Sequence, residues 1–113
     1  MRWNGFSRPR SSAAVAILLA AMPLSAAGAV DRERARELTA LVRQDCGSCH
    51  GMTLKGGLGR ALLPEAIAHI EAEGLAAIIL EGIPGTPMPS WRGELSVEDA
   101  RWIAEKLKEG FPR

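Results

Sequence analysis

The sequence has no tyrosine, and its 113 residues include only three tryptophans and two phenylalanines. No basic patch is present, and aromatic and basic residues do not interleave, which argues against a nucleic-acid partner. Internal repeats and low-complexity segments are also absent, so the length allows one domain. A small domain with so few aromatic side chains has little material for a hydrophobic core. We therefore expect something other than side chains to fill its centre.

Acidic residues are missing from the first ten positions, which carry Arg2, Arg8 and Arg10. An apolar run then extends over 13–24, and the small residues Ala27-Gly28-Ala29 follow it. This order predicts a secretory signal peptide over residues 1–29, which is removed on export. A membrane anchor is the alternative, but the run of about a dozen residues is shorter than the roughly 20 that span a bilayer. We expect a soluble periplasmic domain over 30–113, without stable membrane insertion.

A strand pattern is also absent from residues 30–113, and helical spacing takes its place. Apolar residues recur at helical intervals from 31 to about 44, and Ser96 with Asp99 predicts a capped helix that stops at Gly110. Pro64 predicts a short helix over 64–70, and another is expected over 75–81, ending at Gly82. The stretches 51–59 and 83–93 are rich in glycine and proline, respectively, and are expected to be packed loops. The predicted fold class is all-α.

The chemistry is concentrated in Cys46-Gly47-Ser48-Cys49-His50. This Cys-x-x-Cys-His spacing is the attachment signal for haem c: two thiols reach the two vinyl groups, and the histidine can bind the iron axially. Three alternatives use the same residues. They are a structural disulfide, a redox dithiol, which needs a βαβ context, and a zinc site that adds His69 but lacks a familiar ligand spacing. Covalent haem bound at Cys46 and Cys49, with His50 on the iron, is the prediction.

The second axial ligand has three candidates: Met52, His69 and Met88. Met52 follows His50 too closely to reach the other face of the porphyrin, and a lone histidine on a short helix is more often solvated. Met88 lies between Pro87 and Pro89, which restrict the loop backbone before the sulfur binds the iron. Little conformational entropy is then left to lose on ligation. We predict that Met88 is the axial ligand.

These motifs together resemble a class I monohaem cytochrome c, with Cys46–Gly51 early and residues 85–89, Gly-Thr-Pro-Met-Pro, late. Residues 51–59 with 64–66, and residues 81–91, are more narrowly similar to the small periplasmic cytochrome associated with the haem-containing nitrite reductase of denitrifying bacteria. The resemblance implies a small fold whose terminal helices cross, with haem as its core. Ala35, Leu38 and Val42 would then face residues 102–104, and Trp91 would lie at the haem edge, or simply pack there.

One departure from this family concerns the partner of the His50 ring. Class I cytochromes often have a proline whose carbonyl accepts the histidine N–H, and here the matching position is Arg60. A backbone carbonyl can still orient the ring, so the acceptor stays open. The Arg60 side chain would pair with a haem propionate or remain solvated.

Function follows from a closed iron site. With His50 and Met88 on the iron, no position is free for a substrate, so we predict a non-enzymatic carrier that transfers single electrons by the outer-sphere route. The resemblance implies an upstream donor and the haem-containing nitrite reductase as partners, in electron delivery or in maturation of its d-type haem. The alternative is a haem sensor or enzyme in which Met88 is displaced.

Overall fold

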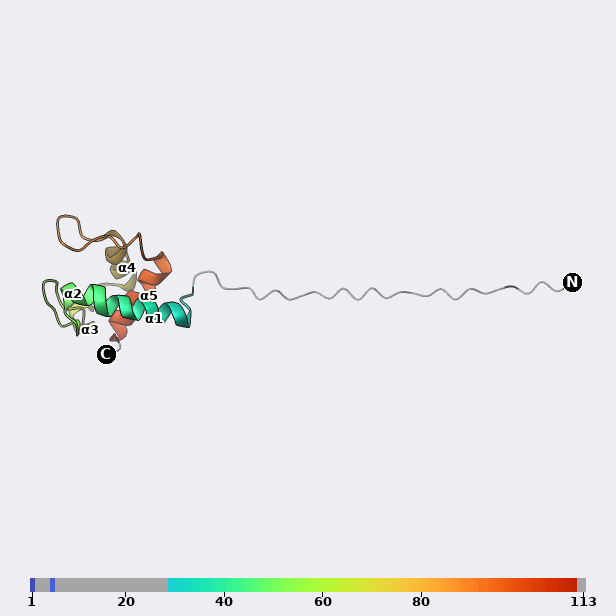
Figure 1. Ribbon diagram of the computed structural model, residues 1–113, viewed down its shortest axis with the longest axis horizontal. Helices are drawn as coiled ribbons and strands as arrows, with labels where there is room; N and C mark the ends of the chain where they lie inside the picture. The colour runs from blue at the N-terminus through green and yellow to red at the C-terminus, as the bar shows by residue number, and fades with distance from the viewer. Residues whose placement is uncertain (2–4, 6–28, 112–113) are drawn as a thin grey trace.

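The computed structural model describes residues 1, 5 and 29–111 of the chain. The predicted signal peptide, 1–29, therefore lies almost entirely outside the described residues. Within the described part the chain is helical and has no strand, so the predicted all-α class is confirmed. Its elements are α1 (Arg32–Leu41), the π-helical turn η1 (Val42–Cys46), α2 (Gly47–His50), α3 (Pro64–Ile67), α4 (Ala72–Glu81) and α5 (Val97–Glu109) (Figure 1). Among the helices of residues 29–111, none combines the length and the apolar character needed to cross a membrane.

Short-range signals correctly place the start of α1 and both ends of α5. The Asp31 side chain accepts the N–H of Arg34 at 2.8 Å and caps the start of α1. Ser96 and Asp99 form a reciprocal capping box, in which each side chain accepts the backbone N–H of the other residue. Gly110 ends α5 with a φ of 99°, which favours glycine.

Three helix boundaries differ from the prediction. The first helix does not end near Gln44 but continues through η1 and α2, until Gly51 adopts a φ of 92°. Helix α4 starts at Ala72 rather than at 75, since the single Gly74 inside it costs only about 1 kcal/mol. Helix α3 ends at Ile67 rather than at 70, and Lys108 Nζ donates to the Ile70 carbonyl at 2.5 Å. That contact gives a hydrogen-bond partner to a backbone carbonyl just beyond the end of α3.

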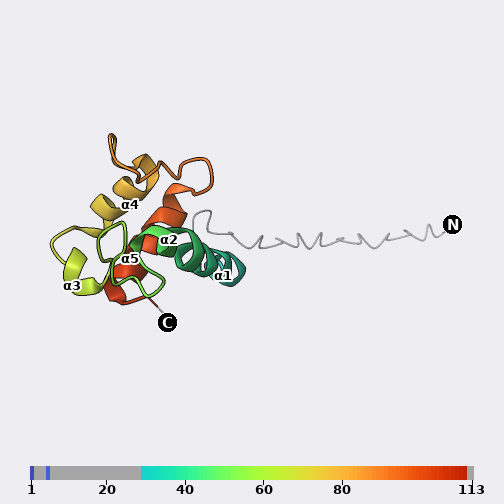
Figure 2. The same cartoon turned by 60° about the vertical axis from the view of Figure 1, so that its left-hand side comes forward.

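The core lies where α1 crosses α5, with α4 packed along the other side of α5 (Figures 1 and 2). Ala100 and Ala104 are fully buried, and such small side chains let two helices approach closely. Leu38 and Val42 share one buried cluster with Ile103 and Ala104, as the resemblance implied. The whole cluster consists of Leu38, Val42, Leu54, Ile67, Leu75, Ala76, Leu80, Leu95, Ala100, Ile103, Ala104 and Leu107.

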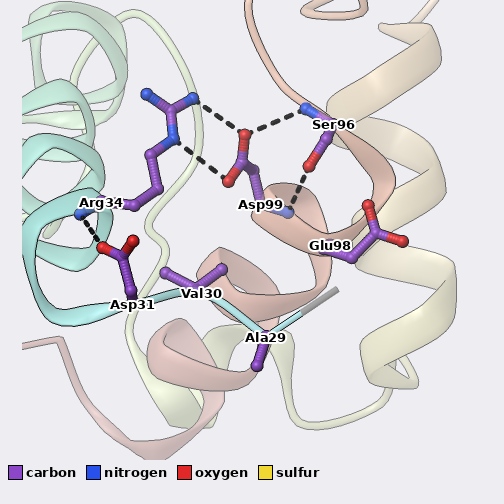
Figure 3. Close-up of a pocket in the computed structure, with 7 residues that line it drawn as sticks. All are labelled: Ala29, Val30, Asp31, Arg34, Ser96, Glu98 and Asp99. Atoms are coloured by element: carbon purple, nitrogen blue, oxygen red, sulfur yellow. Dashed lines mark hydrogen bonds and ion pairs between the residues drawn. The ribbon is translucent and has the colours of Figure 1, made fainter. Parts of the chain in front are cut away.

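An ion pair fastens the start of α1 to the start of α5 (Figure 3). Arg34 Nη2 lies 2.8 Å from Asp99 Oδ2, and Arg34 Nε donates to Asp99 Oδ1 at 3.2 Å. Asp99 also completes the capping box with Ser96, so a buried carboxylate has partners on two helices. The hydrogen bond from Arg34 is the main reason that the pKa of Asp99 lies below its ordinary value.

Replacing Asp99 with asparagine should lower the free energy of unfolding by about 1.5–3 kcal/mol near pH 7, the range for hydrogen bonds to charged groups. Because the folded-state pKa of Asp99 is depressed, its contribution is present above the unfolded pKa of about 3.9. It is lost as the pH falls through the folded-state value. Denaturant titrations of parent and variant should therefore converge in strongly acidic buffer. The control is Glu98→Gln in the same helical turn, which should cost only a few tenths of a kcal/mol. A deficit in Asp99→Asn that stays constant down to acid pH would contradict this account.

Candidate functional site

A cavity of about 540 Å³ opens between α4, α5, the haem-attachment motif and the proline-rich loop. Its volume lies within the roughly 300–1,000 Å³ of typical cofactor pockets. All four predicted site residues, Cys46, Cys49, His50 and Met88, line this cavity. The other lining residues are mostly apolar: Asp45, Leu58, Gly59, Arg60, Leu62, Ile67, Ile70, Leu75, Ile78, Ile79, Ile83, Thr86, Pro87, Pro89, Trp91, Ile103 and Leu107. The fold thus brings together residues that are far apart in the chain.

The two cysteines lie in different environments at the edge of this cavity. Cys46 is half-buried at the end of η1, while Cys49 is exposed on α2, and both are free thiols. Burial, followed by the charge of Asp45, raises the pKa of the Cys46 thiol to about 11. Ser48, between the two cysteines, donates its hydroxyl to the Asp45 carbonyl at 2.7 Å.

The His50 ring is oriented by a backbone carbonyl, and that carbonyl belongs to Arg60. His50 Nδ1 lies 2.7 Å from Arg60 O. A carbonyl can only accept a hydrogen bond, so Nδ1 carries the proton and Nε2 keeps the lone pair that a metal needs. Gly59 permits this approach, because a Cβ at that position would lie 2.8 Å from the His50 Nδ1 and Cε1 atoms. The structure thus supplies the acceptor that the sequence left open.

The glycine-rich loop after His50 folds back onto the Cys-x-x-Cys-His motif, as predicted for a packed loop. Gly56 N–H donates to the His50 carbonyl at 2.8 Å, and Gly59 N–H donates to the Cys49 carbonyl at the same distance. A Cβ at Gly57 would lie 2.8 Å from the Cys49 carbonyl oxygen, so the loop backbone could not approach with a larger residue. These contacts satisfy the last carbonyls of α2 and hold the motif in place.

Met88 and His50 lie 88 − 50 = 38 residues apart in the sequence but border the same cavity. Met88 is half-buried, and its neighbours Thr86, Pro87 and Pro89 line the cavity with it. By contrast, the Met52 residue is 69% exposed, His69 is exposed, and neither borders the cavity.

No three histidine, cysteine or acidic side chains gather into a metal-holding group within the residues that the structure describes. The zinc alternative, which needs Cys46, Cys49, His50 and His69 together, therefore has no support in that part of the chain.

The cavity fits an apolar cofactor in its lining as well as in its size. Leu58 is 95% exposed and Ile83 is 45% exposed, yet both border an apolar cavity that a bound haem would fill. Trp91 borders it too, at the position that the resemblance implied for the haem edge.

Sequence reasoning missed the further lining residues. Their only signal in the sequence is the helical spacing that any core-facing residue shows, as at Ile67, Ile70, Ile78 and Ile79. The place of Thr86 in the cavity lining had no sequence signal either, because a threonine in a loop is common.

The comparisons with known proteins agree with this geometry. Residues 33–105 match the family model described as "Cytochrome C oxidase, cbb3-type, subunit III". The chain is 51% identical over 96 residues to cytochrome c55X of Paracoccus denitrificans, covering 84% of this chain and 93% of that protein.

Two solved structures are similar to the described fold. One is a c-type cytochrome called NirC, with a TM-score of 0.70 and 52% identity, over 72% of this chain and 95% of that one. The other is dihydro-heme d1 dehydrogenase NirN in complex with DHE, with a TM-score of 0.60 and 36% identity. That match covers 66% of this chain but only 16% of NirN, so it concerns one small part of the larger enzyme.

Proposed function

We propose that the protein carries single electrons in denitrification. The chain belongs to the class I monohaem c-type cytochromes, in the group of cytochrome c55X. This family membership confirms the resemblance drawn from the two sequence motifs, and with it comes a covalently bound haem c. The observation that carries the proposal is that Cys46, Cys49, His50 and Met88 all border one apolar cavity.

Each of these residues has a distinct role in the proposal. Cys46 and Cys49 would hold the haem covalently through its two vinyl groups, and His50 would offer Nε2 to the iron while the Arg60 carbonyl accepts the Nδ1 proton. Met88 would offer a thioether sulfur as the second ligand to the iron. The bound haem supplies an iron that changes its oxidation state by one electron at a time. Sulfur ligation favours the reduced state, so Met88 would raise the potential relative to a more basic ligand.

If His50 and Met88 both hold the iron, no position would remain for a substrate, and we infer outer-sphere electron transfer without catalysis. The isoleucine-rich wall from α3 and α4 keeps water from the cofactor. Electrons would then cross at the exposed edge near Cys49, which stands at the rim of the cavity.

We further propose that the mature protein acts in the periplasm and begins at Val30, after removal of residues 1–29. The arginines before the apolar run and the small residues at 27–29 support a cleaved leader. The folded part is consistent with this boundary, because Asp31 already caps the first helix. The mass of the exported protein should equal that of residues 30–113 plus one haem.

The proposed partner is a haem-containing nitrite reductase of the same cell, through electron delivery or maturation of its d-type haem. The motif resemblance supports the first role. The similarity to a small part of dihydro-heme d1 dehydrogenase supports the second, because a domain of this kind occurs there within a larger enzyme.

The test begins with the reduced, exported protein, mixed anaerobically with the oxidised reductase in a stopped-flow spectrometer. Haem c oxidation should be fast, single-exponential and saturable in reductase concentration. An unrelated monohaem cytochrome of similar potential provides the control. A second arm mixes the oxidised protein with the dehydrogenase and its substrate, which should reduce it if it serves in maturation. If neither enzyme exchanges electrons faster with this protein than with the control, the proposed partners are wrong.

A further inference from the structure

The loop that carries Met88 is closed by hydrogen bonds to the backbone of one residue, Ile83. Thr86 N–H donates to the Ile83 carbonyl at 3.1 Å, with Pro84 and Gly85 between them and a φ of 77° at Gly85. Proline followed by a glycine of positive φ is the pattern of a type II turn. Ile83 N–H in turn donates to the Met88 carbonyl at 3.1 Å. Both backbone groups of Ile83 are therefore used to shape this loop.

The Thr86 hydroxyl forms hydrogen bonds with both Ile83 and Met88. Its Oγ1 donates to the Ile83 carbonyl at 2.7 Å and accepts the N–H of Met88 at 3.3 Å. Pro87 and Pro89, on either side of Met88, have no N–H that could compete for the same oxygen. The carbonyl of Met88 is held by Ile83 and its N–H is held by Thr86, so the Met88 backbone is fixed at both polar atoms.

The far side of the loop is attached to the end of α4. Ser90 donates its hydroxyl to the Leu80 carbonyl at 2.6 Å, which satisfies one of the last carbonyls of the helix. Gly82 has a φ of 68°, and a Cβ there would lie 2.7 Å from the Met88 carbonyl oxygen and 2.6 Å from the Pro89 carbonyl carbon. The end of helix α4 therefore supports one side of the loop, and the hydrogen bonds of the Thr86 hydroxyl hold the other side.

We propose that Thr86 is a positioning residue, whose hydroxyl sets the place of the Met88 sulfur in the cavity and so determines how firmly that sulfur holds the iron. The inference deepens the proposed function and rests on ligation of the iron by Met88. Without the hydroxyl, the N–H of Met88 loses its acceptor and the loop can leave the cavity more easily. Sulfur would then be displaced more readily by other ligands.

The experiment uses the exported holo-protein and the variants Thr86→Val, Thr86→Ala and Thr86→Ser. Valine keeps the shape of threonine without the hydroxyl, and serine keeps the hydroxyl. Two quantities are measured on the oxidised protein: the rate of cyanide binding, and the pH at which the sulfur-to-iron absorption is lost. Valine and alanine should speed cyanide binding about two- to tenfold, the factor equivalent to one net hydrogen bond, and move the absorption loss to lower pH. Serine should stay within about twofold of the parent.

Thr53→Val is the matched control, since Thr53 is also an exposed loop threonine but does not border the cavity. It should leave both quantities unchanged. If the parent shows the sulfur-to-iron absorption but valine and alanine behave like the parent, the role of Thr86 is refuted while ligation by Met88 stands. A parent without this absorption would instead refute ligation by Met88. Lower thermal stability alone, with unchanged cyanide binding, would reduce Thr86 to a turn residue and also overturn the inference.

Discussion

Replacing Met88 with alanine should open the iron to external ligands while the haem stays attached. Cys46, Cys49 and His50 remain, so haem content should not change. The weak sulfur-to-iron absorption of the oxidised protein should vanish, and the potential should fall, because the preference of a thioether for reduced iron is lost. Cyanide or carbon monoxide should bind ~100-fold faster or more, since a site that is open for only ~1% of the time slows binding by that fraction.

Two further variants serve as controls for this experiment. Met52→Ala and His69→Ala should leave all three properties nearly unchanged, because both side chains are exposed and neither borders the cavity. If His69→Ala opens the iron instead, the axial ligands are two histidines and the assignment of Met88 is wrong. Rapid cyanide binding by the parent at neutral pH would mean that the site is open, and would favour a sensor or enzyme over a carrier.

Removing both thiols, with Cys46→Ala and Cys49→Ala together, should give a protein whose haem is extracted by acid–acetone and whose haem-free form is largely unfolded. The cavity has a volume of about 540 Å³. At ~24 cal/mol per Å³, an empty cavity of that size would cost at most about 13 kcal/mol. This cost equals the whole stability of a typical small domain, roughly 5–15 kcal/mol. Each single cysteine variant should retain one thioether and lose only part of its haem.

Acid–acetone extraction and far-ultraviolet circular dichroism measure these two effects. Ser48→Ala provides the control, because it changes a residue between the cysteines and keeps both thiols; its haem should resist extraction. Normal helicity in the haem-free double variant would show that the buried side chains alone sustain the fold. In that case the haem would not be a necessary part of the core.

Local signals account for most of what could be predicted here. The attachment motif is contiguous, so its spacing alone identified haem, and family membership confirms that cofactor. Helix ends were predicted well where the cap lies within four residues, as at Asp31 and at Ser96 with Asp99. The predicted ligand residues His50 and Met88 border one cavity, although their roles on the iron remain proposals.

The tertiary structure alone decided which backbone groups serve the site. Every residue has a carbonyl, so residue type could not show that the carbonyl of Arg60 accepts the His50 N–H. The hydrogen bonds that the Thr86 hydroxyl makes with Ile83 and Met88 depend likewise on a turn that brings Ile83 close to Thr86. The end of α3 was misplaced, and the carbonyls just beyond it, of Ala68 and Ile70, accept hydrogen bonds from Lys108, 38 residues beyond Ile70. Sequence by itself thus determined the cofactor and the fold class through local patterns. The path of the backbone, which brings distant residues into contact, determined how the proposed ligands are held.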